Sequence, residues 1–176
     1  VIVSDYPNRM GDISTENGAF RIEAPGWGHI LIVCAEFAPR DEVLEWAKKV
    51  ISDPKYKDDK VIFLTHSYMR ERTGALTDNE GYKIRPANWG KQIWEKLIQP
   101  LPNVDMVICG HTGKPSDDFA DAVAYRVDKN QAGKNVHQMM VNVQTIGGGW
   151  KGNGGDGWLR ILEVMPDGKT IKVRTY

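Results

Sequence analysis

The segment Val61-Ile-Phe-Leu-Thr-His-Ser67 is a short apolar run that ends abruptly in a polar residue and a histidine. A second segment, Val104-Asp-Met-Val-Ile-Cys-Gly-His-Thr-Gly113, has the same arrangement. Short apolar runs rich in β-branched residues are typical of strands buried on both faces of a sheet. Each histidine therefore follows the carboxyl end of a strand, where layered α/β folds bind ligands. Neutral imidazole is a common metal ligand, so His66 and His111 are the first candidate site residues and should lie close together. The alternative is that each histidine only caps a strand end with a hydrogen bond.

Length and composition bound the remaining possibilities. The 176 residues fit a single domain spanning positions 1–176. Lys plus Arg and Asp plus Glu number 23 each, so no net charge attracts the chain to nucleic acid. The sequence contains no run of 18 apolar residues, so it predicts no membrane-spanning helix. The two cysteines, Cys34 and Cys109, lie inside apolar runs, which predicts free thiols in the core.

The first half of the chain predicts alternating strands and helices. Residues 1–18 are polar and predict a loop. Apolar residues at helical spacing follow Asp41, and a second helix is expected over Trp89–Ile98. Between them, the segment Tyr68–Ala87 is long, polar and without periodicity, and such loops tend to be functional, so this one is a candidate wall or lid beside His66. The strands expected in this half are Ala19–Ala24 and His29–Phe37, which form a hairpin, then the Val61 strand and Val104–Cys109.

The second half predicts strands alone, at Val123–Asp128, Val136–Thr145, Trp158–Met165 and Thr170–Tyr176. Pro166-Asp-Gly-Lys169 is a turn sequence, so the last two strands form a hairpin. Strands with helices followed by a run of strands indicate a mixed α/β (α+β) fold. The expected architecture is a layered β-sandwich of mixed sheets flanked by helices.

The order strand-Thr-His, long loop, helix, strand, Gly-His-Thr-Gly resembles the carboxyl-terminal portion of the calcineurin-like metallophosphoesterases. The segment Glu36–Trp46 is similar to the first helix of that family, and Gly157–Leu162 is similar to a closing hairpin of its secreted members. The resemblance covers nearly the whole chain. It implies a metallophosphoesterase-like sandwich that is incomplete at its amino-terminal side.

This family builds a two-metal centre from five motifs, and the resemblance implies which of them this chain carries. His66 matches the histidine of the fourth motif, and His111 matches the first histidine of the fifth, Gly-His-x-His; both would serve one metal. The second histidine of the fifth motif falls on Gly113, which has no side chain. The first three motifs are absent, and with them a bridging carboxylate, an Asn ligand and an acid-base histidine. A divalent cofactor (Mn, Zn, Fe or Mg) is implied, but its ligand set here is incomplete.

Three further residues are candidates for contacts with substrate or with the metal ligands. Glu36 ends its strand at what is expected to be the same edge, although a solvated loop acid is the alternative. Tyr68 lies two residues past His66 and either lines the site or packs in the core. Asp156 belongs to a Gly-rich segment that lacks the spacing of a phosphate-binding loop.

Two functions from different classes are compatible with these features. The first is a metal-dependent phosphoesterase acting on phosphate monoesters or diesters, with the missing motifs supplied by an amino-terminal segment or another chain; this chain alone would then be inactive. The second is a non-catalytic binding module that recognises a glycan or a protein through Trp150, Trp158 and the Tyr68–Ala87 loop. Secretion or a periplasmic location is implied only by the resemblance.

Overall fold

The computed structural model describes residues 1–116, 118–147 and 155–176, and it is an α+β fold built on one large mixed sheet. The strands are β1 (Ile2–Asp5), β2 (Gly18–Ala24), β3 (Gly28–Ala35), β4 (Lys60–Thr65), β5 (Val104–Cys109), β6 (Val123–Lys129), β7 (Asn135–Val141), β8 (Arg160–Val164) and β9 (Ile171–Thr175). The helices are α1 (Asp41–Ile51) and α2 (Gly90–Ile93), and α2 continues into a π-helical turn, Trp94–Ile98. Short 3-10 turns occur at Thr15–Asn17, Pro54–Tyr56, Phe119–Ala122 and Val143–Thr145.

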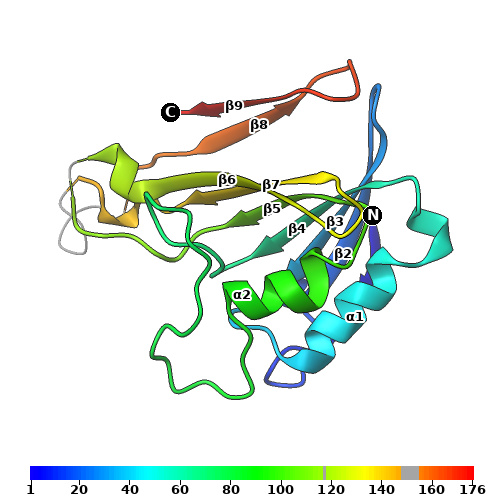
Figure 1. Ribbon diagram of the computed structural model, residues 1–176, viewed down its shortest axis with the longest axis horizontal. Coiled ribbons are helices and arrows are strands. Elements are labelled where there is room, and N and C mark those ends of the chain that lie inside the picture. Colours follow the sequence, from blue (N-terminus) through cyan, green and yellow to red (C-terminus); the bar gives the residue numbers. More distant parts are fainter. Residues whose placement is uncertain (117, 148–154) are drawn as a thin grey trace.

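Seven strands form the large sheet in the order β1-β2-β3-β4-β5-β7-β6. The central strands β3, β4, β5 and β7 run parallel, whereas β1, β2 and β6 pair antiparallel at the two sides. Helices α1 and α2 cover one face of this sheet, and the two-stranded sheet β8–β9 lies over the other face (Figure 1). This sandwich-like layering agrees with the expected fold class at the level of an α+β fold with a large mixed sheet.

The main core lies between the sheet and its helices. Alternate residues of the central strands point to this side and are fully buried, and they pack against the apolar face of α1 and the π-helical turn. Burying such aliphatic and aromatic side chains stabilises a fold by about 1.5–3 kcal/mol each. The side chains that define this core are Leu31, Val33, Val43, Leu44, Ala47, Ile51, Val61, Phe63, Ile93, Leu97, Ile98 and Val107.

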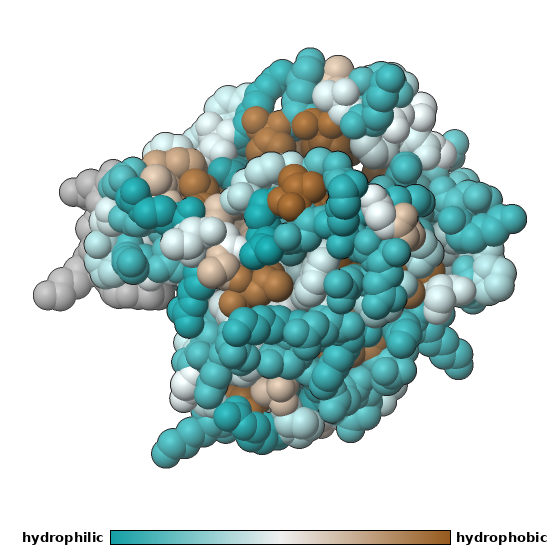
Figure 2. Space-filling view, viewed as in Figure 1, coloured by the Kyte–Doolittle hydropathy of each residue, from teal (hydrophilic) through white to brown (hydrophobic). Residues whose placement is uncertain are grey.

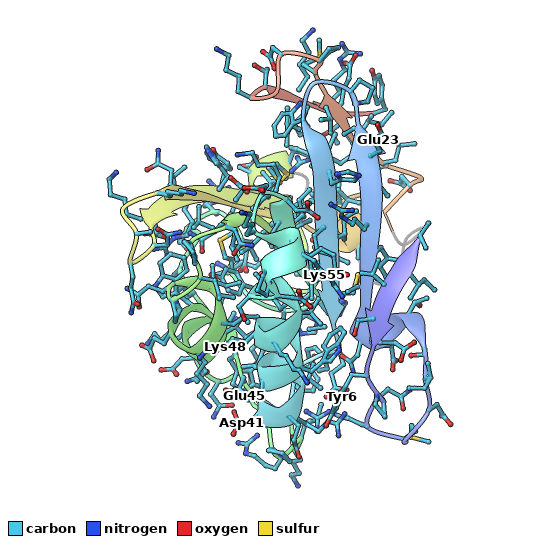
Figure 3. The ribbon with its side chains drawn as sticks, turned by 90° about the vertical axis from the view of Figure 1, so that its right-hand side faces the viewer. Tyr6, Glu23, Asp41, Glu45, Lys48 and Lys55 are labelled. Carbon is cyan, nitrogen blue, oxygen red and sulfur yellow. The ribbon has the colours of Figure 1, made fainter. Side chains whose placement is uncertain are left out.

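Helix α1 begins at Asp41 and ends at Ile51, as its apolar spacing predicts. Asp41 and Glu42 occupy the first turn and Lys48 and Lys49 the last, which is the arrangement that the helix dipole favours. Figure 3 shows Asp41, Glu45 and Lys48 along this helix, on the side away from the sheet.

The face of the sheet opposite the helices is only partly covered. A cavity of about 980 Å³ separates it from the hairpin β8–β9, and apolar side chains of both layers, such as Ile30, Met106 and Val173, line it. Figure 2 shows hydrophobic side chains gathered below the hairpin. The turn of the hairpin is fixed to the β2–β3 turn, because Trp27 Nε1 donates to Met165 O at 2.5 Å.

Three sequence expectations differ from the structure. Residues 1–18 are not all loop, since β1 pairs with β2; this strand is four residues long and irregular in register, so it leaves little pattern. The strand predicted over Val136–Thr145 ends at Val141, where the Asn142 side chain accepts from Gln144 N and starts a 3-10 turn. Strand alternation also places Cys34 on the partly covered face of the sheet.

Both cysteines are free thiols, as the sequence predicts, but only Cys109 is fully buried. Burial raises the pKa of Cys109 to about 12 and also raises the pKa of Cys34. Among the described helices, none combines the length and the apolar character needed to cross a membrane.

The long segment between β4 and α2 is anchored at its base by Thr77. Thr77 N donates to Tyr68 O at 3.0 Å, and Gly90 N donates to Thr77 Oγ1 at 2.9 Å. These bonds bring the amino end of α2 so close to Tyr68 that a Cβ at Gly90 would lie 1.9 Å from Tyr68 O. Gly90 is therefore required by close backbone approach.

We predict that Gly90→Ala destabilises the fold. In an unobstructed helix this change stabilises by roughly 0.8–1.0 kcal/mol through helix propensity. Here the added methyl group displaces the Tyr68 backbone, and such overpacking costs about 1–3 kcal/mol. Urea denaturation of Gly90→Ala and of the exposed helix control Glu95→Ala measures the difference. A Gly90→Ala variant as stable as the wild type would contradict this explanation.

Candidate functional site

The carboxyl ends of the four parallel strands meet at one edge of the sheet. Glu36 follows β3, His66 follows β4, and His111 lies two residues after β5. Asn142 follows β7. Because parallel strands end on the same side, side chains distant in the sequence gather there. We call this the carboxyl edge.

The two histidines form the centre of the carboxyl edge. His111 Nδ1 lies 3.0 Å from His66 Nε2, and the ring centroids are 4.7 Å apart. Gly110 N donates to His66 O at 2.9 Å, and Asn142 Nδ2 donates to His111 O at 2.7 Å, so both backbones are held. His111 itself adopts a left-handed conformation with φ of 70°, which is uncommon outside glycine. The predicted proximity of His66 and His111 is confirmed.

An aromatic wall shields one side of the histidine pair. The ring of Phe37 lies 5.4 Å from that of His66 and 5.0 Å from that of His111, and Tyr82 and Trp89 pack edge-on against Phe37. Burial lowers the pKa of His66, the charge of His111 lowers it further, and the charge of Glu80 opposes both. The lowered pKa favours the neutral form of His66, which is the state in which imidazole binds metal.

Glu80 is the acidic neighbour of the pair, and sequence reasoning missed it. Its Oε2 lies 2.9 Å from His111 Nε2, and Ser67 Oγ donates to its Oε1 at 2.5 Å. The side chain of Glu80 is only 4% exposed. The sequence made the Tyr68–Ala87 loop a candidate wall or lid beside His66, and the structure places Glu80 of this loop against His111. An unpatterned loop gives no signal that selects Glu80 among its acids.

The donor set fits part of a metal site. Two imidazole nitrogens point at each other across 3.0 Å, while Glu80 lies on the opposite nitrogen of His111. Within residues 1–116, 118–147 and 155–176, no three His, Cys, Asp or Glu side chains are grouped so that they could hold a metal. Gly113 leaves little space for another ligand, since a Cβ there would lie 3.1 Å from Thr145 Oγ1 and 3.3 Å from Asn142 Nδ2.

A pocket of about 350 Å³ opens beside the histidines. His66, His111 and Asn142 line it from the segments that follow β4, β5 and β7. Trp158 lines it from the segment that leads into β8, and Arg160 lines it from the first position of that strand. The Trp158 ring also stacks on Phe119 at 5.1 Å, so one of its faces is already used. The pocket combines imidazole, amide, indole and guanidinium groups, which can bind an anionic ligand.

The secondary candidates have different positions. Glu36 is not a solvated loop acid: it is 6% exposed, and its carboxylate accepts from Arg40 Nε at 2.9 Å and from Asn17 Nδ2 at 3.0 Å. Tyr68 is fully buried and donates to Gln138 Oε1 at 2.7 Å, so it packs in the core. Asp156 is exposed and lies against Gly147. Trp150 lies outside the described residues.

Comparisons with known proteins leave the family open. No protein-family profile matches the chain. The chain is 28% identical over 177 residues to the uncharacterized protein YvnB of Bacillus subtilis (strain 168). The alignment covers 97% of this chain and 11% of that protein, so the chain spans only a small part of the length of the curated relative it matches.

We predict that the Glu36 cluster makes stability depend on pH. Burial raises the pKa of Glu36, but the hydrogen bonds from Arg40 and Asn17 and the charges of Arg40 and Arg9 lower it more, so the net pKa lies below its ordinary value. A carboxylate with a lowered folded pKa stabilises above its unfolded pKa, and this stabilisation is lost as pH falls through the folded pKa. Glu36→Gln should therefore lose about 1–3 kcal/mol at pH 7 and progressively less at acid pH.

Denaturation of the wild type and of Glu36→Gln at pH 7 and pH 3 measures this loss. The exposed acid Glu45 on α1 provides the control Glu45→Gln. A loss of equal size at both pH values would show that the charge of Glu36 contributes nothing.

Proposed function

We propose that this chain supplies one part of the metal site of a calcineurin-like metallophosphoesterase, a metal-dependent hydrolase of phosphate monoesters or diesters. His66 and His111 are the proposed ligands of one divalent ion. The observation that carries the proposal is the 3.0 Å separation of His66 Nε2 and His111 Nδ1. Metal–imidazole bonds are about 2.0–2.1 Å long, so two imidazole nitrogens bound to one ion lie about 3 Å from each other.

The residues around His66 and His111 support the binding of a divalent ion by this pair. His66 and His111 would hold a divalent ion, which would supply Lewis-acid chemistry for the polarisation of a phosphoryl oxygen. This chain lowers the pKa of His66, packs Phe37 against its ring, and holds both histidine backbones with hydrogen bonds from Gly110 and Asn142. Arg160 in the adjacent pocket provides a cation for a phosphate group.

The rest of the ligand set is proposed to come from a segment outside residues 1–176 or from another chain. Two neutral nitrogens leave the charge of a divalent ion uncompensated, and zinc sites ordinarily have three or four protein ligands. The crowding at Gly113 also favours ligands from elsewhere, because a larger residue at this position would have to displace Thr145 or Asn142.

A second candidate is a non-catalytic binding module. The pocket beside the histidines favours it, because Trp158 and Arg160 are recognition groups that work without a metal. The two proposals differ in whether the histidine pair binds a divalent ion.

We predict that His66 and His111 bind one ion together, weakly in this chain alone. Titration with Zn²⁺ should move the imidazole NMR signals of both residues with one saturating isotherm. Either His66→Ala or His111→Ala should abolish the shift of the remaining partner, because a single imidazole is a poor chelate. The chain has two other histidines, so His29→Ala and His137→Ala are matched controls that leave the isotherm unchanged. Independent shifts of all four histidines would contradict a shared site.

We predict that residues 1–176 do not hydrolyse phosphate esters at an enzymatic rate. The two-metal mechanism needs ligands to hold a second ion, and the described residues of this chain group no three side chains for even one. The assay uses an aryl phosphate monoester and a diester with Mn²⁺ or Zn²⁺ added. Metal-dependent turnover that disappears in both His66→Ala and His111→Ala would contradict the prediction and show that the chain has a complete site.

A further inference from the structure

We infer that Glu80 is a positioning residue for the proposed metal ligand His111: it keeps the proton of that imidazole on Nε2 and leaves the Nδ1 lone pair directed at His66 Nε2. This inference rests on the proposed function, and it names the group that prepares the site for an ion. Its first support is the contact of 2.9 Å between Glu80 Oε2 and His111 Nε2.

The position of the carboxylate selects one tautomer of His111. If Nε2 carried a lone pair, two electron-rich atoms would face each other at 2.9 Å with little water to screen them. A proton on Nε2 turns the same contact into an attraction. Nδ1 is then the unprotonated nitrogen, and it is the one 3.0 Å from His66. Metal-binding histidines commonly direct their other ring nitrogen to a carboxylate, which fixes the tautomer and makes the ligand more basic.

The carboxylate itself is fixed by the fold. Ser67 is fully buried directly after His66, and its hydroxyl donates to Glu80 Oε1. Glu80 therefore contacts both histidine loops, through Ser67 on one and through His111 on the other. It lies three residues after Thr77, which is bonded to Tyr68 and Gly90. A nearly buried carboxylate with these partners is not a solvated loop acid.

The test compares Glu80→Gln with Glu95→Gln, a matched change of an exposed acid on the π-helical turn. In the metal-free chain, nitrogen-15 NMR of the imidazoles should show His111 in the Nε2–H tautomer in the wild type and in Glu95→Gln, and a mixture of tautomers in Glu80→Gln. Titration with Zn²⁺ should show affinity about 10–100-fold weaker in Glu80→Gln, the range found when such partners of metal ligands are removed.

The outcomes separate this inference from the function on which it rests. If Zn²⁺ binds the wild type and Glu80→Gln changes neither tautomer nor affinity, the positioning role is overturned while the metal site stands. If Zn²⁺ does not bind the wild type but Glu80→Gln still converts His111 from the Nε2–H tautomer to a mixture of tautomers, the positioning role stands and the proposed metal site is overturned.

Ser67→Ala is the second variant in case Glu80→Gln does not fold. It keeps the carboxylate but removes its hydrogen bond, so we expect a partial loss of the Nε2–H tautomer. An unchanged tautomer in folded Ser67→Ala, with Glu80→Gln unfolded, would overturn the inference.

Discussion

The parallel pairing of β3, β4, β5 and β7 is the constraint on which the candidate site depends. It aligns four strand ends, and each chain segment that leaves them carries a polar or aromatic side chain into the same space. Parallel pairs need crossover connections, and on one face of the sheet α1 supplies the one from β3 to β4 and α2 the one from β4 to β5. The histidine pair is therefore a consequence of topology: His66 and His111 are 45 positions apart in sequence and 3.0 Å apart in space.

The two acidic side chains buried at the carboxyl edge, Glu36 and Glu80, have different partners. The carboxylate of Glu36 forms ion pairs with Arg40 and Arg9 and accepts a hydrogen bond from Asn17, and these interactions fix the segment before α1. Glu80 is instead turned toward His111. Two acids near one sheet edge thus have separate partners, and only Glu80 contacts an imidazole. The distinction depends on the side chains that surround each carboxylate, because its neighbours decide what a buried charge can do.

Much of the fold could be predicted from local pattern. Apolar runs predicted β3, β4 and β5, helical spacing predicted α1, and the shared strand–histidine arrangement predicted the proximity of His66 and His111. The edge strand β1 and the end of β7 were missed because irregular pairing and side-chain capping by Asn142 leave no periodicity. Glu80 was missed for another reason. Its role arises from a contact with His111 across 31 residues of sequence, and neither spacing nor composition encodes such a contact in an irregular loop.

The anchor at Thr77 determines how the segment before α2 can vary in evolution. Its hydrogen bonds to Tyr68 and Gly90 close the base of an Ω-shaped excursion whose tip lies beyond Glu80. The entropy of closing such an excursion grows only with the logarithm of its length, so changes of length that keep Tyr82 packed against Phe37 disturb the fold little. The base does not share this tolerance, because any shift of Thr77 carries Glu80 away from His111. Homologous chains should therefore differ in the length of the tip while keeping the spacing between the threonine and the acid.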